Sequence, residues 1–274
     1  MIFFKSKKNL DFSKNKFLFM RHAETIYNSA PEKNFKYNPK YADSHLSQKG
    51  ITQSLNIQNI LNKLNIETIY ISPYYRALET MEYALQSHPN AKNIVAYVHP
   101  ELTELAGMMH EFIFDIKETK NNFNLNSKIK VDWSIFDEYV KNIKYKENLF
   151  FMDNWDLIEE KKRDEIYFKF NDLYEKGDMD IYKKEVSKII EERYKMKLKF
   201  ESYKNAYQRF IDFKNYINNK YVNSMNDTEK KILVISHKTF ISIATSDENC
   251  IFKNNKTSKN CLVLDNCEIA PFSI

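Results

Sequence analysis

The stretch FLFMRHAETIYN, residues 17–28, is the most informative segment of this chain. Its first four residues are apolar, which is typical of a short buried strand. The run ends in Arg21 and His22, and the carboxyl end of a buried strand is where open α/β sheets bind their ligands. An imidazole can act as a nucleophile, and a guanidinium beside it can hold a phosphoryl group through two hydrogen bonds. A single pair of this kind is more often structural than catalytic, so the rest of the chain has to decide between the two.

Strands and helices alternate along much of the remaining sequence. Residues 67–71, 94–98 and 231–235 are runs of β-branched, aromatic and aliphatic side chains, as in strands. Helices are expected at about 47–64, where Ser47 is a good N-cap, and at 74–86, 201–225 and 239–246. The tail, at 261–264 and 268–270, is expected to add one or two closing strands at the edge of the sheet.

Length and composition fit a folded domain. The 274 residues suffice for one large α/β domain, or for a domain with an insert. With 43% hydrophobic residues a core can be filled, and only 3 Gly and 6 Pro argue against linker-rich or disordered classes. The net charge of +5 suits an anionic substrate, but a lysine-rich surface produces it equally well. Because the lysines are scattered among acids and form no stripe, we expect no nucleic-acid partner.

The cysteines and the N-terminus bear on location. Cys250, Cys261 and Cys267 are odd in number and lack CxxC spacing, which argues against a disulfide framework and a zinc site. Reduced thiols in a cytoplasmic protein are the plain interpretation. Residues 1–16 lack the apolar core of a signal peptide, and no apolar run approaches the ~20 residues that cross a bilayer. We therefore expect a cytoplasmic protein with no membrane partner.

Five motifs occur along the chain in a fixed order: RHxETxxN at 21–28, DxxLSxxGxxQ at 43–53, SPxxRAxxT at 72–80, LxE at 102–104 and ISH at 235–237. Together they resemble the histidine phosphatase superfamily, also called phosphoglycerate-mutase-like, in the branch with the RHxE opening motif. The resemblance covers residues 16–107 and 228–247. It implies an α/β fold with three layers, α/β/α, and a mostly parallel central sheet.

The resemblance also implies roles for individual residues. His22 is expected to become a phosphohistidine, and Arg21, Arg76 and His237 are expected to hold the phosphoryl oxygens. Glu104 is the expected general acid, with Glu101 as the alternative. The remaining expected substrate-binding residues are Asn28, Thr25, Glu24 and Lys238. Neither a metal nor a cofactor is expected.

Departures from the family pattern favour one reaction over another. The chain has Ala23 and Lys238 where the family often has glycine, and Glu104 is followed by Leu105-Ala106-Gly107 instead of the substrate clamp of the mutases. A metal-independent phosphomonoester phosphatase is therefore favoured. A phosphoglycerate-type phosphomutase and a catalytically inactive binding or scaffold protein remain the alternatives. The substrate is expected to be a small phosphorylated molecule or a phosphoprotein, and the sequence predicts neither its identity nor the oligomeric state.

Residues 108–200 carry no family motif, but their apolar residues have helical spacing. We interpret the chain as a single domain, 1–274, with 108–200 as a helical insert or cap. As a lid, the insert would exclude water and select the leaving group. The alternative is an insert that extends the core or forms an oligomer contact. His110, close behind the acid candidate, is expected to be solvated, with a place in the pocket wall as the alternative.

Overall fold

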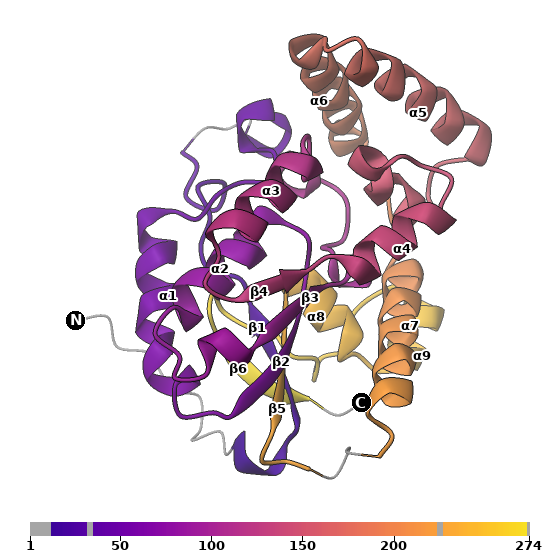
Figure 1. Cartoon of the computed structure of the whole chain (residues 1–274). Helices are drawn as coiled ribbons and strands as arrows, with labels where there is room; N and C mark the ends of the chain where they lie inside the picture. The colour runs from indigo at the N-terminus through magenta and orange to yellow at the C-terminus, as the bar shows by residue number, and fades with distance from the viewer. Residues whose placement is uncertain (1–11, 32–34, 224–226, 273–274) are drawn as a thin grey trace.

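The structure is a computed structural model that describes residues 12–31, 35–223 and 227–272 (Figure 1). In these residues six strands form one sheet in the order β4-β3-β2-β5-β1-β6. The five parallel strands are β1 (Phe17–Arg21), β2 (Ile66–Ile71), β3 (Val95–Val98), β4 (Lys130–Asp132) and β5 (Lys231–Ser236). β6 (Ile269–Phe272) pairs with β1 in the antiparallel direction. The expected mostly parallel sheet is therefore confirmed.

Successive residues of β1 point to opposite faces of the sheet, so each face has its own apolar core. Leu18 and Met20 pack with residues of α1 (Gln48–Leu61) and α2 (Tyr75–Leu85). Phe17 and Phe19 pack with residues of α7 (Tyr203–Tyr221) and α8 (Lys238–Ala244). Figure 1 shows α1 and α2 on one side of the sheet and α7 on the other. The result is the three-layer α/β/α arrangement.

The helix starts agree with their capping residues. Ser47 accepts a hydrogen bond from the backbone N–H of Gly50 at 3.1 Å, which confirms it as the N-cap of α1. Ser202 caps α7 in the same way, through the N–H of Asn205 at 3.0 Å. The predicted ends of α1 and α7 extend a few residues too far, because a continuing apolar pattern does not require a continuing helix.

Residues 108–200 are mainly helical: α3 (Ile116–Asn126), α4 (Ser134–Asn142), a 3-10 helix (Glu147–Asn154), α5 (Glu160–Glu175) and α6 (Met179–Lys195). They also contribute the short edge strand β4. In Figure 1, α5 and α6 form a hairpin that projects from one end of the molecule. Trp155, Phe170 and Tyr182 from this segment belong to the same apolar core as α1 and α2. The segment is thus packed onto the sheet domain through a shared core.

The C-terminal segment differs from expectation in two places. Residues 261–264 form no strand, so β6 is the one closing strand among the described residues. A helix that the sequence interpretation missed, α9 (Glu248–Asn254), precedes them. The three cysteines are free. Within the described residues no helix is both long and apolar enough to span a membrane. Residues 1–11, most of the segment predicted to lack a signal peptide, lie outside the described residues.

Candidate active site

β1 and β5 each deliver a histidine to the carboxyl edge of the sheet. Arg21 and Ser236 are register partners, so the residues that follow them, His22 and His237, are neighbours in space. The two imidazole ring centroids lie 5.1 Å apart, and both side chains are buried. The backbone N–H of His22 donates to the Ser236 carbonyl at 3.0 Å. The structure thus brings together two histidines from opposite ends of the sequence.

The hydrogen bond of the His22 ring defines which nitrogen is free to react. Nδ1 lies 2.7 Å from the backbone carbonyl oxygen of Ala23. A carbonyl oxygen only accepts, so Nδ1 carries the hydrogen and Nε2 keeps its lone pair. Burial holds the pKa of His22 well below its ordinary value, and the charges of Arg76 and Arg21 lower it further. His22 is therefore a neutral imidazole near pH 7 with a nucleophilic Nε2.

Arg76 lies in the first turn of α2 and connects several segments around the two histidines. We call His22, His237, Arg21 and Arg76 the histidine cluster. Nε of Arg76 donates to Nδ1 of His237 at 3.2 Å, and its Nη1 donates to the His110 carbonyl at 2.7 Å and lies 4.0 Å from an Asp43 carboxylate oxygen. Because Nδ1 of His237 accepts, Nε2 carries the hydrogen and donates to the Ser72 hydroxyl at 2.7 Å. Both ring nitrogens of His237 are therefore engaged by the protein.

Two guanidinium N–H groups in this cluster are buried without a partner among the described residues, namely Nε of Arg21 and Nη2 of Arg76. The Arg76 side chain is fully buried, and Nη1 of Arg21 donates to the Leu264 carbonyl at 3.1 Å. Leaving a buried charged donor unsatisfied costs about 1–3 kcal/mol or more, and an anion would remove that cost. The two donors therefore indicate where a bound phosphoryl group would lie.

The Glu104 carboxylate lies at the N-terminus of α8. It accepts hydrogen bonds from the backbone N–H groups of Thr239 at 3.1 Å and Phe240 at 2.9 Å. A further bond comes from its neighbour Leu105 at 2.9 Å. The residue is 8% exposed, and its charge acts on the Arg21 guanidinium. The amides at the N-terminus of α8 therefore hold the carboxylate of the acid candidate.

Glu101, the alternative acid, has a different environment. Burial raises the pKa of its carboxyl to about 7. The charges that act most strongly on it belong to Arg209, Asp212 and Asp153, which lie in α7 and the 3-10 helix that ends at Asn154. The electrostatic interaction between Glu104 and Arg21 favours Glu104 over Glu101 as the candidate acid.

Glu111 is a buried carboxyl that the sequence interpretation did not single out. Its Oε2 accepts from the backbone N–H groups of Gly107 at 2.5 Å and Met108 at 2.7 Å, which closes the loop after the acid candidate. Burial raises its pKa to about 8, and the negative charge of Glu104 acts in the same direction. Glu111 is therefore protonated in much of the folded protein at neutral pH.

We expect Glu111→Gln to flatten the pH dependence of stability. Because the folded state holds this proton up to about pH 8 and the unfolded state releases it near the ordinary glutamate pKa of 4.5, folding stability should fall as the pH rises through that window. The wild type should lose on the order of 2–3 kcal/mol more than the variant between pH 5 and 8. Urea unfolding of both proteins across this range measures the difference. Parallel curves would contradict the buried proton.

His110 was expected to be solvated, and this expectation was wrong. Its side chain is 13% exposed, and its ring stacks on Tyr27 with centroids 3.7 Å apart. Nδ1 is buried without a partner among the described residues, and Nε2 lies 3.5 Å from a Glu111 carboxylate oxygen. Its charge would act on both His22 and His237. A third imidazole therefore borders the cluster, and no motif in the sequence pointed to it.

The other predicted substrate-binding residues lie around this cluster with partners of their own or at the surface. Asn28 is exposed, and its Oδ1 accepts from the backbone N–H and the hydroxyl of Thr25 at 3.1 and 2.9 Å. Glu24 forms an ion pair with Lys49 at 2.5 Å, at the start of α1. Lys238 is exposed at the first position of α8. Among the four, only Thr25 is buried.

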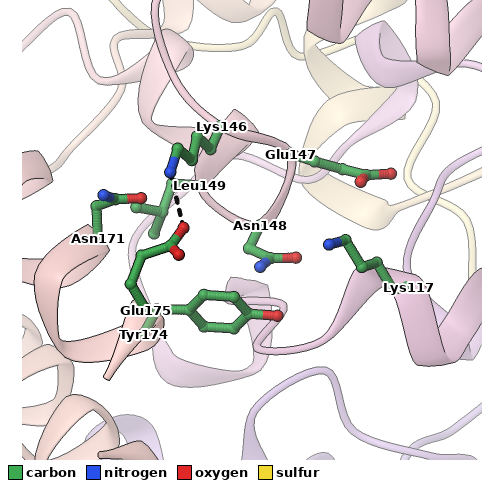
Figure 2. A pocket seen from close by; sticks show the side chains of 8 residues that line it. All are labelled: Lys117, Lys146, Glu147, Asn148, Leu149, Asn171, Tyr174 and Glu175. Atoms are coloured by element: carbon green, nitrogen blue, oxygen red, sulfur yellow. Dashed lines mark hydrogen bonds and ion pairs between the residues drawn. The ribbon is translucent and has the colours of Figure 1, made fainter. Parts of the chain in front are cut away.

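A separate cavity of about 210 Å³ lies between α3, the 3-10 helix and α5 (Figure 2). Asn148 and Tyr174 point into it, and the ion pair of Lys146 and Glu175, 2.7 Å long, closes one side. It shares no residue with the histidine cluster. Among the described residues no group of three or more His, Cys, Asp or Glu side chains is arranged to hold a metal ion.

Comparison with known proteins gives a family match for one part of the chain. The model of the histidine phosphatase superfamily, branch 1, matches residues 17–126, and no curated protein matches the sequence. Three solved structures are similar: phosphoglycerate mutase from Bacillus anthracis (16% identity, 96% of this chain and 95% of that chain covered, TM-score 0.44), ecdysone phosphate phosphatase from Bombix mori in complex with tungstate (13%, 92% and 86%, 0.47), and alpha-ribazole phosphatase from Shigella flexneri (14%, 82% and 75%, 0.39).

The matched segment contains four of the five motifs, and with them His22, both arginines and Glu104. Residues 17–126 of this chain therefore match the histidine phosphatase superfamily, branch 1.

Proposed function

We propose that this protein is a metal-independent phosphomonoester phosphatase, a phosphoric monoester hydrolase that works through a phosphohistidine on His22. The observation that carries the proposal is the pair of buried, unpartnered N–H groups on Arg21 and Arg76 beside a neutral imidazole whose Nε2 is free. Positive charge and a nucleophile that meet in a buried site suit a phosphate ester.

The reaction has two steps. In the first, Nε2 of His22 attacks phosphorus, and a P–N bond forms as the P–O bond to the leaving group breaks. Glu104 supplies the proton that the leaving oxygen takes up. In the second, Glu104 takes a proton from a water molecule whose oxygen attacks phosphorus, and the P–N bond breaks to release phosphate. Arg21 and Arg76 hold the equatorial oxygens and neutralise the charge that develops on them.

His237 and the peripheral residues support this chemistry. For His237 to hold a phosphoryl oxygen, the Ser72 hydroxyl has to give up its place as the acceptor of the Nε2 hydrogen. Asn28 would reach the substrate through Nδ2, since its Oδ1 already accepts from Thr25. We assign Glu24, Thr25 and Lys238 to the outer part of the substrate site.

The insert, residues 108–200, would act as a cap within a single domain, 1–274. Its support is positional, because the first residues of the insert include His110, whose carbonyl accepts a hydrogen bond from Arg76. At its far end, Ser187 of α6 donates to the Tyr37 carbonyl at 2.6 Å, in the loop that follows the first motif. A cap in this place would select among small phosphorylated substrates or phosphoproteins. The free cysteines agree with a cytoplasmic location.

The test is hydrolysis of p-nitrophenyl phosphate and a panel of small phosphate esters in the presence of EDTA. We expect turnover that EDTA leaves unchanged. Activity lost with EDTA and restored by a metal would contradict metal independence. Conversion of 3-phosphoglycerate only when 2,3-bisphosphoglycerate is added would favour a phosphomutase. No turnover on any ester, together with retained phosphate binding, would favour an inactive binding protein.

A further inference from the structure

Arg209 and Glu201 form a buried ion pair beside the acid candidate. Nε of Arg209 donates to Oε1 of Glu201 at 2.8 Å, and Nη2 donates to Oε2 at 3.1 Å, so the contact is bidentate. The residues are 4% and 0% exposed. An apolar pair of similar size often stabilises a core as well as a buried ion pair does, so stability alone gives little reason for this one. The reason has to lie in what the two side chains hold.

Both side chains bind backbone on either side of Glu104. Nη1 of Arg209 donates to the carbonyl of Glu101 at 2.7 Å and to the carbonyl and hydroxyl of Thr103, each at 3.1 Å. Oε2 of Glu201 accepts from the N–H of Ala106 at 3.4 Å. The pair therefore fixes the path of the chain immediately before and after the acid.

Arg209 also faces the element that binds the Glu104 carboxylate. Its guanidinium carbon lies 5.1 Å from the ring centroid of Phe240, whose backbone N–H donates to Glu104. Arg209 contacts both the segment that carries Glu104 and the helix whose amides orient its carboxylate. Replacing this guanidinium would shift the segment that carries Glu104 relative to α8.

The pair ties this arrangement to the insert. Glu201 follows Phe200, whose ring lies 4.6 Å from that of Trp155. Ser202, on the other side, donates through its backbone N–H and its hydroxyl to Asp156 at 2.7 and 2.6 Å. The end of the insert is thus anchored on both sides of Glu201.

We propose that Arg209 and Glu201 are positioning residues for Glu104, which hold the acid in register with α8 and link it to the insert. The inference rests on the proposed phosphatase function. It predicts a defect in the proton transfers of Glu104, and in kcat/KM, which reports the first step, this defect appears as poorer protonation of the leaving group. The hydrogen bonds of Arg209 and Glu201 do not involve His22, Arg21 or Arg76.

The experiment compares p-nitrophenyl phosphate with phenyl phosphate, which is similar in shape but has a leaving group that needs protonation far more. In Arg209→Met we expect kcat/KM for phenyl phosphate to fall about 100-fold, and that for p-nitrophenyl phosphate to fall less than about 10-fold. Arg209→Lys keeps the positive charge but loses the planar guanidinium that binds a carboxylate through two hydrogen bonds. It should show the same difference between the two esters, with a smaller loss of kcat/KM. The lysine variant preserves the test if the methionine variant does not fold.

Lys231→Met is the matched control. Lys231 is also 4% exposed, and its Nζ donates to the carbonyls of Phe12 and Asn15 at 2.7 and 2.9 Å, at the opposite end of β5. Its loss should lower stability and reduce activity on both esters by one common factor. If the Arg209 variants also lose activity on both esters equally, the positioning role is overturned. A wild-type protein inactive on both esters would instead overturn the proposed function itself.

Discussion

Replacement of His22 by asparagine is expected to lower kcat for p-nitrophenyl phosphate by about 10⁴-fold or more. The variant has no nitrogen lone pair to attack phosphorus, whereas wild-type Nε2 is left free by the Nδ1 bond to Ala23. Steady-state kinetics measure the loss. Wild-type protein quenched in alkali during turnover should gain the mass of one phosphate on His22, and the variant should gain none.

The same variant should keep its phosphate-binding groups. Arg21 and Arg76 remain, and asparagine retains an N–H donor near the Ala23 carbonyl, so inorganic phosphate should bind within about tenfold of the wild-type affinity by calorimetry. In the wild type, NMR of the free enzyme should show a neutral His22 with hydrogen on Nδ1 at pH 6, since its pKa lies well below 6.5. Turnover within tenfold of wild type, or a phosphate found on another residue, would exclude His22 as the nucleophile.

Gly50→Ala is expected to lower the free energy of unfolding by about 3 kcal/mol or more, and kcat/KM by about 100-fold. A Cβ at this position would lie 2.0 Å from the carbonyl oxygen and 2.9 Å from the carbonyl carbon of Glu24. These are backbone atoms that cannot rotate away. Glu24 stands two residues after His22, so a shift there reaches the nucleophile. Urea unfolding and steady-state kinetics measure the two effects.

Gly107→Ala is the control for this substitution. A Cβ there would meet its nearest atom, Oε2 of Glu111, at 3.7 Å, which is an ordinary contact. We expect a change in unfolding free energy below about 1 kcal/mol. Equal effects at the two positions would show that loss of glycine flexibility, and not the close approach to Glu24, is responsible.

The sequence predicted the elements that carry a regular pattern. β1 and β5 are buried on both faces of the sheet almost throughout, β2 is exposed only at Glu67, and β3 alternates between half-buried and buried residues. Ser47 marks the start of α1 by a hydrogen bond that its residue type allows. β4 was missed because its three residues are partly exposed at an edge, where burial imposes no pattern. Residues 261–264 looked like a strand, but an apolar run without a pairing partner remains irregular.

The candidate site also has residues that the sequence predicted and residues that it did not. His22, Arg76 and His237 were predicted to meet, because strand ends on one edge of a parallel sheet converge, and the rings and guanidinium do so. Their roles in the reaction remain predictions. Glu111 was not predicted, and for His110 a place in the pocket wall was only the alternative to a solvated position. The burial of both depends on the path of a loop closed by contacts with Gly107, Met108 and Arg76.

The position of β5 in the sheet has a consequence for synthesis on the ribosome. β1 has β5 and β6 as its two neighbours, and both come from the last part of the chain. At about 5–20 residues per second, the emerging polypeptide waits on the order of tens of seconds with both edges of its first strand unsatisfied. Bare strand edges recruit other chains, so this protein should depend on holdase chaperones while it is being made. Translation that stops before Lys231 should leave a fragment that aggregates and lacks His237.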